Sequence, residues 1–263
     1  MKDVLVTGAY GGMGAAFSSL LIKEGYRVFA LDIKECEKKE NLIPIKVDLT
    51  NENSVLSALS EVKTYTEGLY AIIHFAGVYM LDSLIEMDTA DFARIFDINL
   101  KGAFLVNKHF SSLLTQGGRI LITTSELAPL DPLPFTGIYA VTKAALDKYA
   151  YSLRMEMQLL SVSVSVLRAG AIKTDMLSVS TDCLERFTEK TQLYPCNAKR
   201  FKKIVDSVES RSVSTEKLAA YAKGIIEKKK PRFAYSLNRN PLLLIFNALP
   251  KRFQFWIIRK ILK

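Results

Sequence analysis

The sequence contains few cysteines and few histidines. Of its 263 residues, three are cysteines, at positions 36, 183 and 196, and two are histidines. The cysteines are odd in number, lie far apart and form no CxxC pair, which argues against a disulfide framework or a zinc site. We therefore predict no metal, and a chain that resides in a reducing, cytoplasmic compartment.

Long apolar runs are absent as well. No stretch of eighteen consecutive apolar residues occurs, so the sequence predicts no membrane-spanning helix. The apolar stretch within MKDVLVTGAYGG, at the start, is too short for a signal peptide and leads directly into a strand and a turn. The expectation is a chain that is not an integral membrane protein.

Acidic residues are missing from the end of the sequence. None follows Glu227, whereas ten lysines and arginines do, and these ten exceed the formal net charge of +9. Residues 1–227 therefore carry a net charge of −1. A nearly neutral body with a basic, apolar tail argues against nucleic acid as a partner and directs attention to the C-terminus.

Short apolar segments alternate with segments of helical periodicity. The predicted strands cover residues 2–7, 27–32, 42–48, 69–77, 118–125 and 161–168. The predicted helices cover residues 15–25, 52–62, 90–114 and 138–160. Such alternation predicts an α/β fold, a Rossmann-like doubly wound parallel sheet in a single domain. We expect this domain to span residues 1–236, with a substrate loop at 175–214 and a helical tail at 237–263.

A glycine-rich turn, TGAYGGMG at residues 7–14, lies between the first predicted strand and the first helix. Glycines let the backbone approach a pyrophosphate closely, and the helix N-terminus supplies N–H donors. The spacing fits both GxxxGxG and GxxGxxG, and a turn that serves packing alone is the alternative. The turn residues predicted to bind a dinucleotide are Gly8, Gly11, Gly12, Met13 and Gly14.

Asp32 ends the second predicted strand, eighteen residues beyond Gly14. A carboxylate at this position accepts hydrogen bonds from the hydroxyls of the adenosine ribose. It also repels a 2′-phosphate, so the pattern predicts NAD in preference to NADP, with the nearby Lys34 reducing that preference. An ordinary solvated aspartate is the alternative.

Tyr139 and Lys143 lie four residues apart in YAVTK, near the start of a predicted helix. Residues four apart share a helix face, so the ammonium can lie beside the phenol and lower its pKa from about 10. Ser125 ends the fifth predicted strand, at the sheet edge where ligands bind. These residue types predict acid–base chemistry on a substrate oxygen. The alternatives are a surface Tyr–Lys pair and a capping serine, with Thr123 and Thr124 as competitors for its role.

Together these motifs resemble the short-chain dehydrogenase/reductase family, with HFAG at 74–77, FDINLKG at 96–102 and GAIKT at 170–174 adding to the match. The resemblance covers roughly residues 2–174 and is to hydroxysteroid and retinol dehydrogenase-like members. It implies that Tyr139 is the acid/base and that Ser125 polarises the substrate oxygen. It implies that Lys143 binds the nicotinamide ribose and lowers the pKa of Tyr139, while Asn99 holds a water in a proton relay. The further cofactor contacts that it implies are Asp48, Leu49, Ala76, Gly77, Ile172 and Thr174.

The sequence departs from the family pattern at three places. HFAG replaces the usual NNAG, and we interpret His74 as a packed strand residue rather than a base. Ala169-Gly170 replaces Pro-Gly. Ser125 and Tyr139 are fourteen residues apart rather than about thirteen, which predicts a one-residue bulge in the intervening loop, ELAPLDPLPFTGI.

Apolar residues in the substrate loop and before Tyr139 predict a hydrophobic pocket. They are Met176, Leu177, Leu184, Phe187, Leu193, Tyr194, Phe201, Leu130, Leu133, Pro134 and Phe135. A helical pair that packs on the sheet is the alternative explanation for the loop residues. With the resemblance, the pocket predicts a hydrophobic secondary alcohol or ketone as substrate. A steroid or bile acid is the first expectation, followed by retinoids and long-chain acyl carbonyl compounds.

In the tail at 237–263, Phe253, Trp256, Ile257 and Ile261 recur at helical spacing among five cations. A helix of this kind can lie on an anionic membrane, so peripheral membrane contact is one prediction. The alternatives are that the tail folds over the substrate pocket or packs against another subunit. Family resemblance implies a homodimer or homotetramer.

Two other functions stay open from the sequence. A nucleotide-sugar epimerase or dehydratase shares the glycine turn and the Tyr–Lys pair but needs a larger C-terminal domain than the roughly 90 residues after GAIKT provide. A non-catalytic NAD-binding regulator would have no need of Ser125, Tyr139, Lys143 and Asn99 together.

Overall fold

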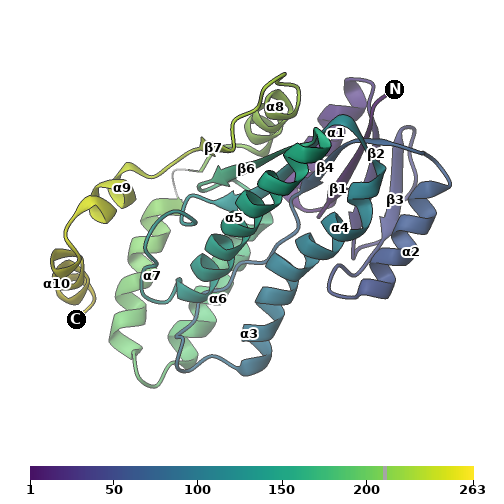
Figure 1. Ribbon diagram of the computed structural model, residues 1–263. Coiled ribbons are helices and arrows are strands. Elements are labelled where there is room, and N and C mark those ends of the chain that lie inside the picture. The colour runs from purple at the N-terminus through teal and green to yellow at the C-terminus, as the bar shows by residue number, and fades with distance from the viewer. Residues whose placement is uncertain (210–211) are drawn as a thin grey trace.

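A seven-stranded sheet forms the centre of the molecule. The computed structural model describes residues 1–209 and 212–263, apart from the side chains of residues 175–182 and 206–209. All strands are parallel, in the order β3-β2-β1-β4-β5-β6-β7 (Figure 1). They are β1 (Asp3–Thr7), β2 (Arg27–Asp32), β3 (Leu42–Lys46), β4 (Leu69–His74), β5 (Leu114–Ser125), β6 (Ser163–Ala169) and β7 (Ala234–Leu237).

Helices cover both faces of this sheet. They are α1 (Gly12–Lys23), α2 (Glu52–Lys63), α3 (Thr89–Phe96), α4 (Gly102–Phe110), α5 (Gly137–Met157), α6 (Asp175–Lys190), α7 (Pro195–Glu209), α8 (Thr215–Ile226), α9 (Pro241–Ala248) and α10 (Lys251–Leu262). Successive side chains of β1 enter opposite cores: Leu5 packs with α2, α4 and α5, whereas Val4 and Val6 pack with α1 and α8. This alternation follows from the two-residue period of a strand. The predicted Rossmann-like doubly wound sheet is therefore confirmed.

The strand order reverses between β1 and β4, because the chain runs outward to β3 and then returns to the other side of β1. Helices that leave neighbouring strands at such a point diverge to opposite faces, and a crevice forms beyond the carboxyl ends of the strands. The glycine turn after β1 and HFAG at the end of β4 meet there. The fold thus places the sequence motifs at the edge where ligands bind in open α/β sheets.

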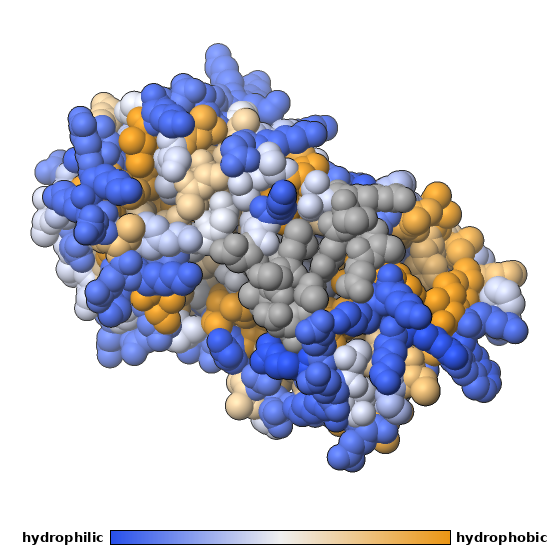
Figure 2. Space-filling model, turned by 180° about the vertical axis from the view of Figure 1, so that it is seen from behind, coloured by the Kyte–Doolittle hydropathy of each residue, from blue (hydrophilic) through white to orange (hydrophobic). Residues whose placement is uncertain are grey.

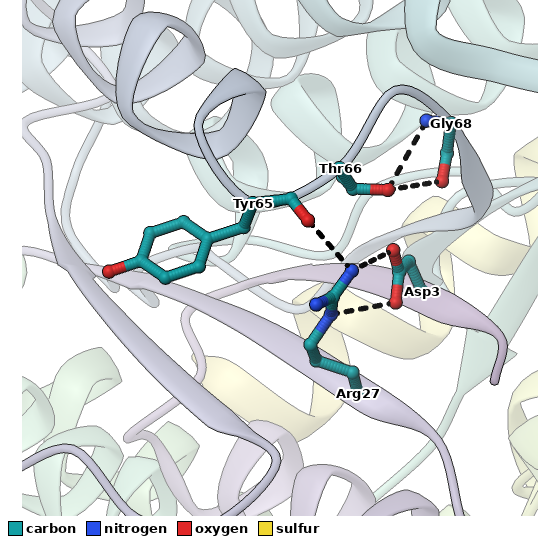
Figure 3. Close-up of polar contacts among 5 residues, drawn as sticks. All are labelled: Asp3, Arg27, Tyr65, Thr66 and Gly68. Carbon is teal, nitrogen blue, oxygen red and sulfur yellow. Dashed lines mark hydrogen bonds and ion pairs between the residues drawn. The ribbon is translucent and has the colours of Figure 1, made fainter.

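The amino ends of the strands form the opposite edge, which polar contacts hold together (Figure 3). Arg27, at the start of β2, donates from Nε to Asp3 Oδ1 at 2.9 Å and from Nη2 to the Tyr65 carbonyl at 3.0 Å. In the same turn Thr66 Oγ1 donates to the Gly68 carbonyl at 3.0 Å. These contacts join β1, β2 and the approach to β4 at the edge away from the motifs.

The prediction of one long helix at 90–114 is wrong in two respects. A π-helical turn, η1 (Asp97–Lys101), interrupts it, and the strand β5 already begins at Leu114. Inserted π turns are typical of functional sites, and this one contains Asn99. The strand β7 was not predicted. It is only four residues long and pairs with β6 at the edge of the sheet.

The tail forms two helices, α9 and α10, which lie beside α7 at the end of the molecule away from α2 and β3 (Figure 1). Pro250 separates them, since it lacks the N–H that would continue α9. Within the part of the chain that the structure describes, no helix is both long and apolar enough to cross a membrane.

Candidate active site

Ser125, Tyr139 and Lys143 come together at the carboxyl edge of the sheet. Ser125 is the last residue of β5, and the other two lie one turn apart in α5, all three being buried. The Ser125 hydroxyl hydrogen-bonds the phenol of Tyr139, and Lys143 Nζ lies 5.7 Å from the centre of the tyrosine ring. The three side chains line one cavity of about 220 Å³.

The neighbouring threonines are arranged differently from Ser125. Thr124 Oγ1 donates to Asp147 at 3.3 Å, so its hydroxyl is already engaged. Thr123 lines the cavity, and its buried hydroxyl has no hydrogen-bond partner among the described residues. Of the three hydroxyls, that of Ser125 alone contacts the phenol of Tyr139 in the described part of the chain.

An ion pair holds α5 against the sheet below these residues. Tyr139, Lys143 and Asp147 follow one another at four-residue intervals, which places them along one helix face. Arg168 of β6 donates to both carboxylate oxygens of Asp147, from Nε at 3.0 Å and from Nη2 at 2.8 Å. This two-point contact fixes the orientation of the helix face that carries Tyr139 and Lys143.

Asn99 joins three parts of the site. Its Oδ1 accepts from Val78 N at 2.8 Å, while its Nδ2 donates to Val78 O at 3.0 Å and to Thr142 Oγ1 at 3.1 Å. A Cβ added to Gly77 would lie 3.2 Å from both Asn99 Oδ1 and Lys143 Nζ. The absence of a side chain at Gly77 therefore leaves room for both Asn99 and Lys143.

Burial sets the protonation of the two titratable residues. It raises the pKa of Tyr139 to about 12, although the hydrogen bond with Ser125 acts in the opposite direction. It also lowers the pKa of Lys143 to about 8, because the interior disfavours the ammonium. The pKa of Tyr139 thus lies above its ordinary value, whereas the sequence predicts a lowered one. At neutral pH the phenol is protonated and able to donate its proton.

Sequence reasoning missed Glu126, which follows Ser125 and lines the same cavity. Its Oε2 accepts from the backbone N–H of Asn240 at 2.6 Å, just before α9. Burial raises the pKa of this carboxyl, and the Asn240 hydrogen bond opposes the rise. The one available signal was an acidic residue directly after the motif serine. Asn240, its partner, lies 114 residues further along the chain.

A second cavity, of about 760 Å³, adjoins the first and shares Met13, Gly77 and Thr174 with it. It contains most of the residues predicted for the dinucleotide, and Ile172 lines the smaller cavity. The predicted residues that line the larger cavity are Gly8, Gly11, Gly12, Met13, Gly14, Asp32, Asp48, Leu49, Ala76, Gly77 and Thr174.

The glycine turn fits a pyrophosphate. A Cβ at Gly14 would lie 2.1 Å from the Gly8 carbonyl oxygen, and one at Gly8, whose φ is +64°, would lie 2.6 Å from Ala76 N. Only glycine allows these backbone approaches. Gly11 precedes α1 without a side-chain cap, which leaves the N–H donors of the first turn for a ligand.

Asp32 hydrogen-bonds the turn as well as lining the cleft. Its Oδ2 accepts from Tyr10 N at 2.9 Å and its Oδ1 from Lys34 N at 3.1 Å. Each carboxylate oxygen has a second acceptor site that a ribose hydroxyl could use. Two cations, Lys34 and Arg94, line the same cleft, and sequence reasoning named only the first.

His74 packs in the interior rather than lining either cavity. Its Nε2 lies 3.0 Å from Asn107 Oδ1, and Asn107 Nδ2 donates to the hydroxyl of Tyr149 at 3.2 Å. Burial lowers the pKa of His74 to about 4, so the ring is neutral at pH 7. This placement agrees with its interpretation as a packed strand residue.

The buried His74 predicts a loss of stability in mild acid. Below its ordinary pKa of 6.5 the unfolded chain binds a proton that the folded chain does not, so the free energy of unfolding falls as the pH falls toward 4. From pH 7 to pH 5 this group alone is expected to contribute a loss of about 2 kcal/mol. The free energy of unfolding of His74→Asn should fall less between these two pH values, as measured by urea titration at each. Equal losses in the two proteins would contradict the assignment.

Only some of the residues predicted for the pocket line the cavity. Leu133 and Phe201 do, whereas Leu184 and Phe187 are buried between α6 and α7. Leu193 is exposed. The side chains of Met176 and Leu177 lie outside the described residues. A helical pair does form, as the alternative predicts, but Leu184 and Phe187 pack with Leu81, Phe135 and α10 rather than on the strands of the sheet.

Phe135 connects the loop before Tyr139 to this helical pair. Its ring lies 4.7 Å from that of Phe187 and 5.5 Å from that of Phe201, measured between centres. Its φ of +64° is in the left-handed region, which is uncommon for a bulky residue. Phe135 is thus the irregular residue in the segment where the spacing predicted a bulge.

The tail forms part of the wall of the smaller cavity. Leu243 of α9 lines it, and Leu262 of α10 is buried with Phe201 and Leu184. Asn197 of α7 donates to the Leu262 carbonyl at 2.6 Å. The tail therefore packs beside the pocket, and Leu243 lines it.

Residues 2–183 match the family profile described as short chain dehydrogenase. The protein belongs to the short-chain dehydrogenase family. An NADPH-dependent 1-acyldihydroxyacetone phosphate reductase of Schizosaccharomyces pombe is 31% identical over 184 residues, 67% of this chain and 62% of that protein. Estradiol 17-beta-dehydrogenase 2 of Mus musculus is 33% identical over 189 residues, 66% of this chain and 49% of that one. The chain thus matches 62% and 49% of the length of these two relatives, less than two thirds of each.

Solved structures share the fold of this family member. A short chain dehydrogenase/reductase of Burkholderia phymatum in complex with NAD superposes with a TM-score of 0.78, at 19% identity, over 95% of this chain and 93% of that one. Ligand-free aldohexose dehydrogenase of Thermoplasma acidophilum gives 0.75, at 17% identity, over 90% and 92%.

Proposed function

We propose that this short-chain dehydrogenase is an NAD(P)-dependent oxidoreductase that interconverts a hydrophobic secondary alcohol and its ketone. One observation carries the proposal. Ser125, Tyr139 and Lys143 line a single cavity, and this cavity adjoins the cleft formed by the glycine turn. A reacting carbon bound beside Tyr139 would therefore lie next to the place where a nicotinamide can be held.

The roles follow from the protonation and contacts of these residues. In the direction of reduction, the protonated phenol of Tyr139 donates its proton to the carbonyl oxygen, and the Ser125 hydroxyl hydrogen-bonds the same oxygen. Lys143 and the glycine turn would hold the dinucleotide, and Asn99 fixes the loop after β4 at Val78. The bound nicotinamide supplies or accepts the hydride.

The substrate class rests on the lining of the cavity. Its walls are mostly apolar and include Leu133, Phe201 and Leu243. Its volume of about 220 Å³ exceeds the roughly 150 Å³ of a cavity that holds benzene, so a ring or a short acyl segment fits around the reacting carbon. The names of the relatives point to steroids and acylated compounds. We propose a hydroxysteroid or bile acid first and an acyl ketone second.

A substrate panel tests the proposal. Hydroxysteroids, bile acids, retinol, acyl ketones and simple alcohols are offered with NAD or NADP, and turnover is followed at the absorbance of the reduced nicotinamide. Turnover of apolar alcohols with kcat/KM well above that of short polar ones is the expected result. Tight dinucleotide binding with no turnover of any compound would favour a non-catalytic regulator instead.

We propose NAD as the preferred cofactor, supported by the carboxylate of Asp32 in the cleft. Asp32→Ala is expected to weaken the binding of NAD more than that of NADP, by about tenfold in the ratio of the two dissociation constants. The variant loses a charge-assisted hydrogen bond to the ribose of NAD and removes the repulsion of the 2′-phosphate of NADP. Titration calorimetry with both dinucleotides measures the ratio. Lys34→Ala is the converse variant and should weaken the binding of NADP but not that of NAD. An unchanged ratio in Asp32→Ala would refute the role of the carboxylate.

Glu126 is expected to disfavour substrates with a negative charge near the carbonyl. It is the one carboxylate among the described residues that line the smaller cavity, where charges repel strongly. Glu126→Gln retains the size and the acceptor for Asn240. It should raise kcat/KM for a keto acid relative to its methyl ester by about tenfold or more. The exposed Glu40→Gln is the matched control, and an equal change there would contradict the prediction.

We also propose that the enzyme forms a homodimer or homotetramer. Apolar side chains on α4 and α5 support this proposal, since Phe104, Tyr151 and Met155 are about half exposed. Light scattering during gel filtration measures the mass.

A further inference from the structure

The helix α10 has two faces with different surroundings. Gln254, Ile258 and Leu262 recur every fourth residue and face the body of the protein, where Gln254 and Leu262 are buried. At 100° per residue, the side opposite to them carries Arg252, Phe253, Trp256, Lys260 and Lys263. We call these five residues the tail face. All five are exposed, with Phe253 at 60% and Trp256 at 58%.

We propose that the tail face docks onto an anionic lipid bilayer. Large exposed aromatic residues beside cations match the interface of a membrane, where aromatic rings enter the boundary of the acyl chains and cations meet phosphate groups. Leu242 and Ile245 of α9 extend the exposed apolar surface, each at 63%. Seen from behind, hydrophobic surface gathers at the end of the molecule formed by α9 and α10, next to hydrophilic side chains (Figure 2).

The charges of the tail favour lipid over a second copy of the chain. Of the cations in α10, Lys251 pairs with Asp131, whereas no ion pair among the described residues involves Arg252, Lys260 or Lys263. The sequence after Glu227 has no acidic residue. A symmetric dimer through the tail face would bring like charges together, because such an interface uses the same surface twice. An anionic headgroup layer neutralises them instead.

Hydrogen bonds hold the tail beside the smaller cavity, so docking of the tail face would also position the active site. Asn238 Nδ2 donates to the Ala171 carbonyl at 2.8 Å, and Asp131 N donates to Asn247 Oδ1 at 3.2 Å. The tail is thus held firmly beside the smaller cavity, into which Leu243 projects next to the exposed Leu242. Docking through the tail face would hold the wall of the substrate cavity at the lipid surface, where a hydrophobic substrate is dissolved. This consequence rests on the proposed function, whereas the docking does not.

The single tryptophan of the chain, Trp256, reports on this surface directly. The experiment mixes the full-length protein with vesicles of phosphatidylcholine alone or of phosphatidylcholine and phosphatidylserine. With phosphatidylserine we expect the tryptophan emission to shift to shorter wavelength and the protein to sediment with the vesicles. Both effects should weaken as salt is raised. An unchanged emission, or a shift that depends on protein concentration in the absence of lipid, would overturn the proposal.

Charge variants distinguish binding through the tail face from binding through the overall positive charge. Lys260→Glu with Lys263→Glu should lower partitioning onto the anionic vesicles by about tenfold or more. Lys229→Glu with Lys230→Glu changes the net charge equally at exposed positions outside the tail and should have a much smaller effect. Equal losses in the two pairs would refute a specific docking surface. Circular dichroism checks folding, and because neither readout needs turnover, the result is independent of the substrate panel.

Discussion

Replacing Tyr139 with phenylalanine is expected to lower kcat by a factor of about 10²–10⁴ in either direction of the reaction. The phenol hydrogen-bonds Ser125 and is protonated at neutral pH, so it can transfer a proton to or from the substrate oxygen. Phenylalanine keeps the ring and its edge-to-face packing on Tyr79, whose ring centre lies 4.6 Å away. The variant should therefore fold and bind the dinucleotide as the wild type does, and lose only the proton transfer.

Steady-state kinetics on the best substrate of the panel, together with calorimetric titration of the dinucleotide, check this result. Tyr151→Phe is the matched control, because the same hydroxyl is removed from an exposed position on the same helix. A Tyr139→Phe enzyme that retains most of its kcat would show that another group transfers the proton. Thr123, whose hydroxyl is buried beside the cavity, would then be the next residue to test.

The sequence predicted the fold largely because the strands are short, apolar and separated by helices with a clear period. It could not reveal β7, because this strand is only four residues long. So short a segment shows no clear alternation of apolar and polar residues. It could not reveal the π turn either, because Asn99 lies in an otherwise regular helical pattern and the insertion depends on contacts with Val78 and Thr142.

The motif spacing found the residues that meet in the site, but not their electrostatics. The pKa of Tyr139 was expected to fall because Lys143 is near, whereas burial, which only the folded structure shows, raises it. The wall of the cavity was missed for a related reason. Leu243 and the Glu126–Asn240 contact depend on a tail that returns across more than a hundred residues of sequence.

The glycine turn gives the second large expected effect. Gly14→Ala should lower the free energy of unfolding by about 3 kcal/mol or more, because its Cβ would lie 2.1 Å from the Gly8 carbonyl oxygen, a backbone atom that cannot yield without moving the turn. Dinucleotide binding should be lost with it. Urea denaturation and calorimetric titration measure the two quantities.

Gly11→Ala separates stability from binding. The nearest atom to its Cβ is the same Gly8 oxygen, at 3.5 Å, which is an ordinary contact, so the variant should unfold at nearly the wild-type urea concentration. Gly11 nevertheless lines the cleft directly before α1, where a pyrophosphate would meet the first N–H donors of the helix. We expect Gly11→Ala to weaken dinucleotide binding while leaving the fold intact. If binding were unchanged, the pyrophosphate would not lie against this turn, and the nicotinamide would have to reach Tyr139 from another part of the cleft.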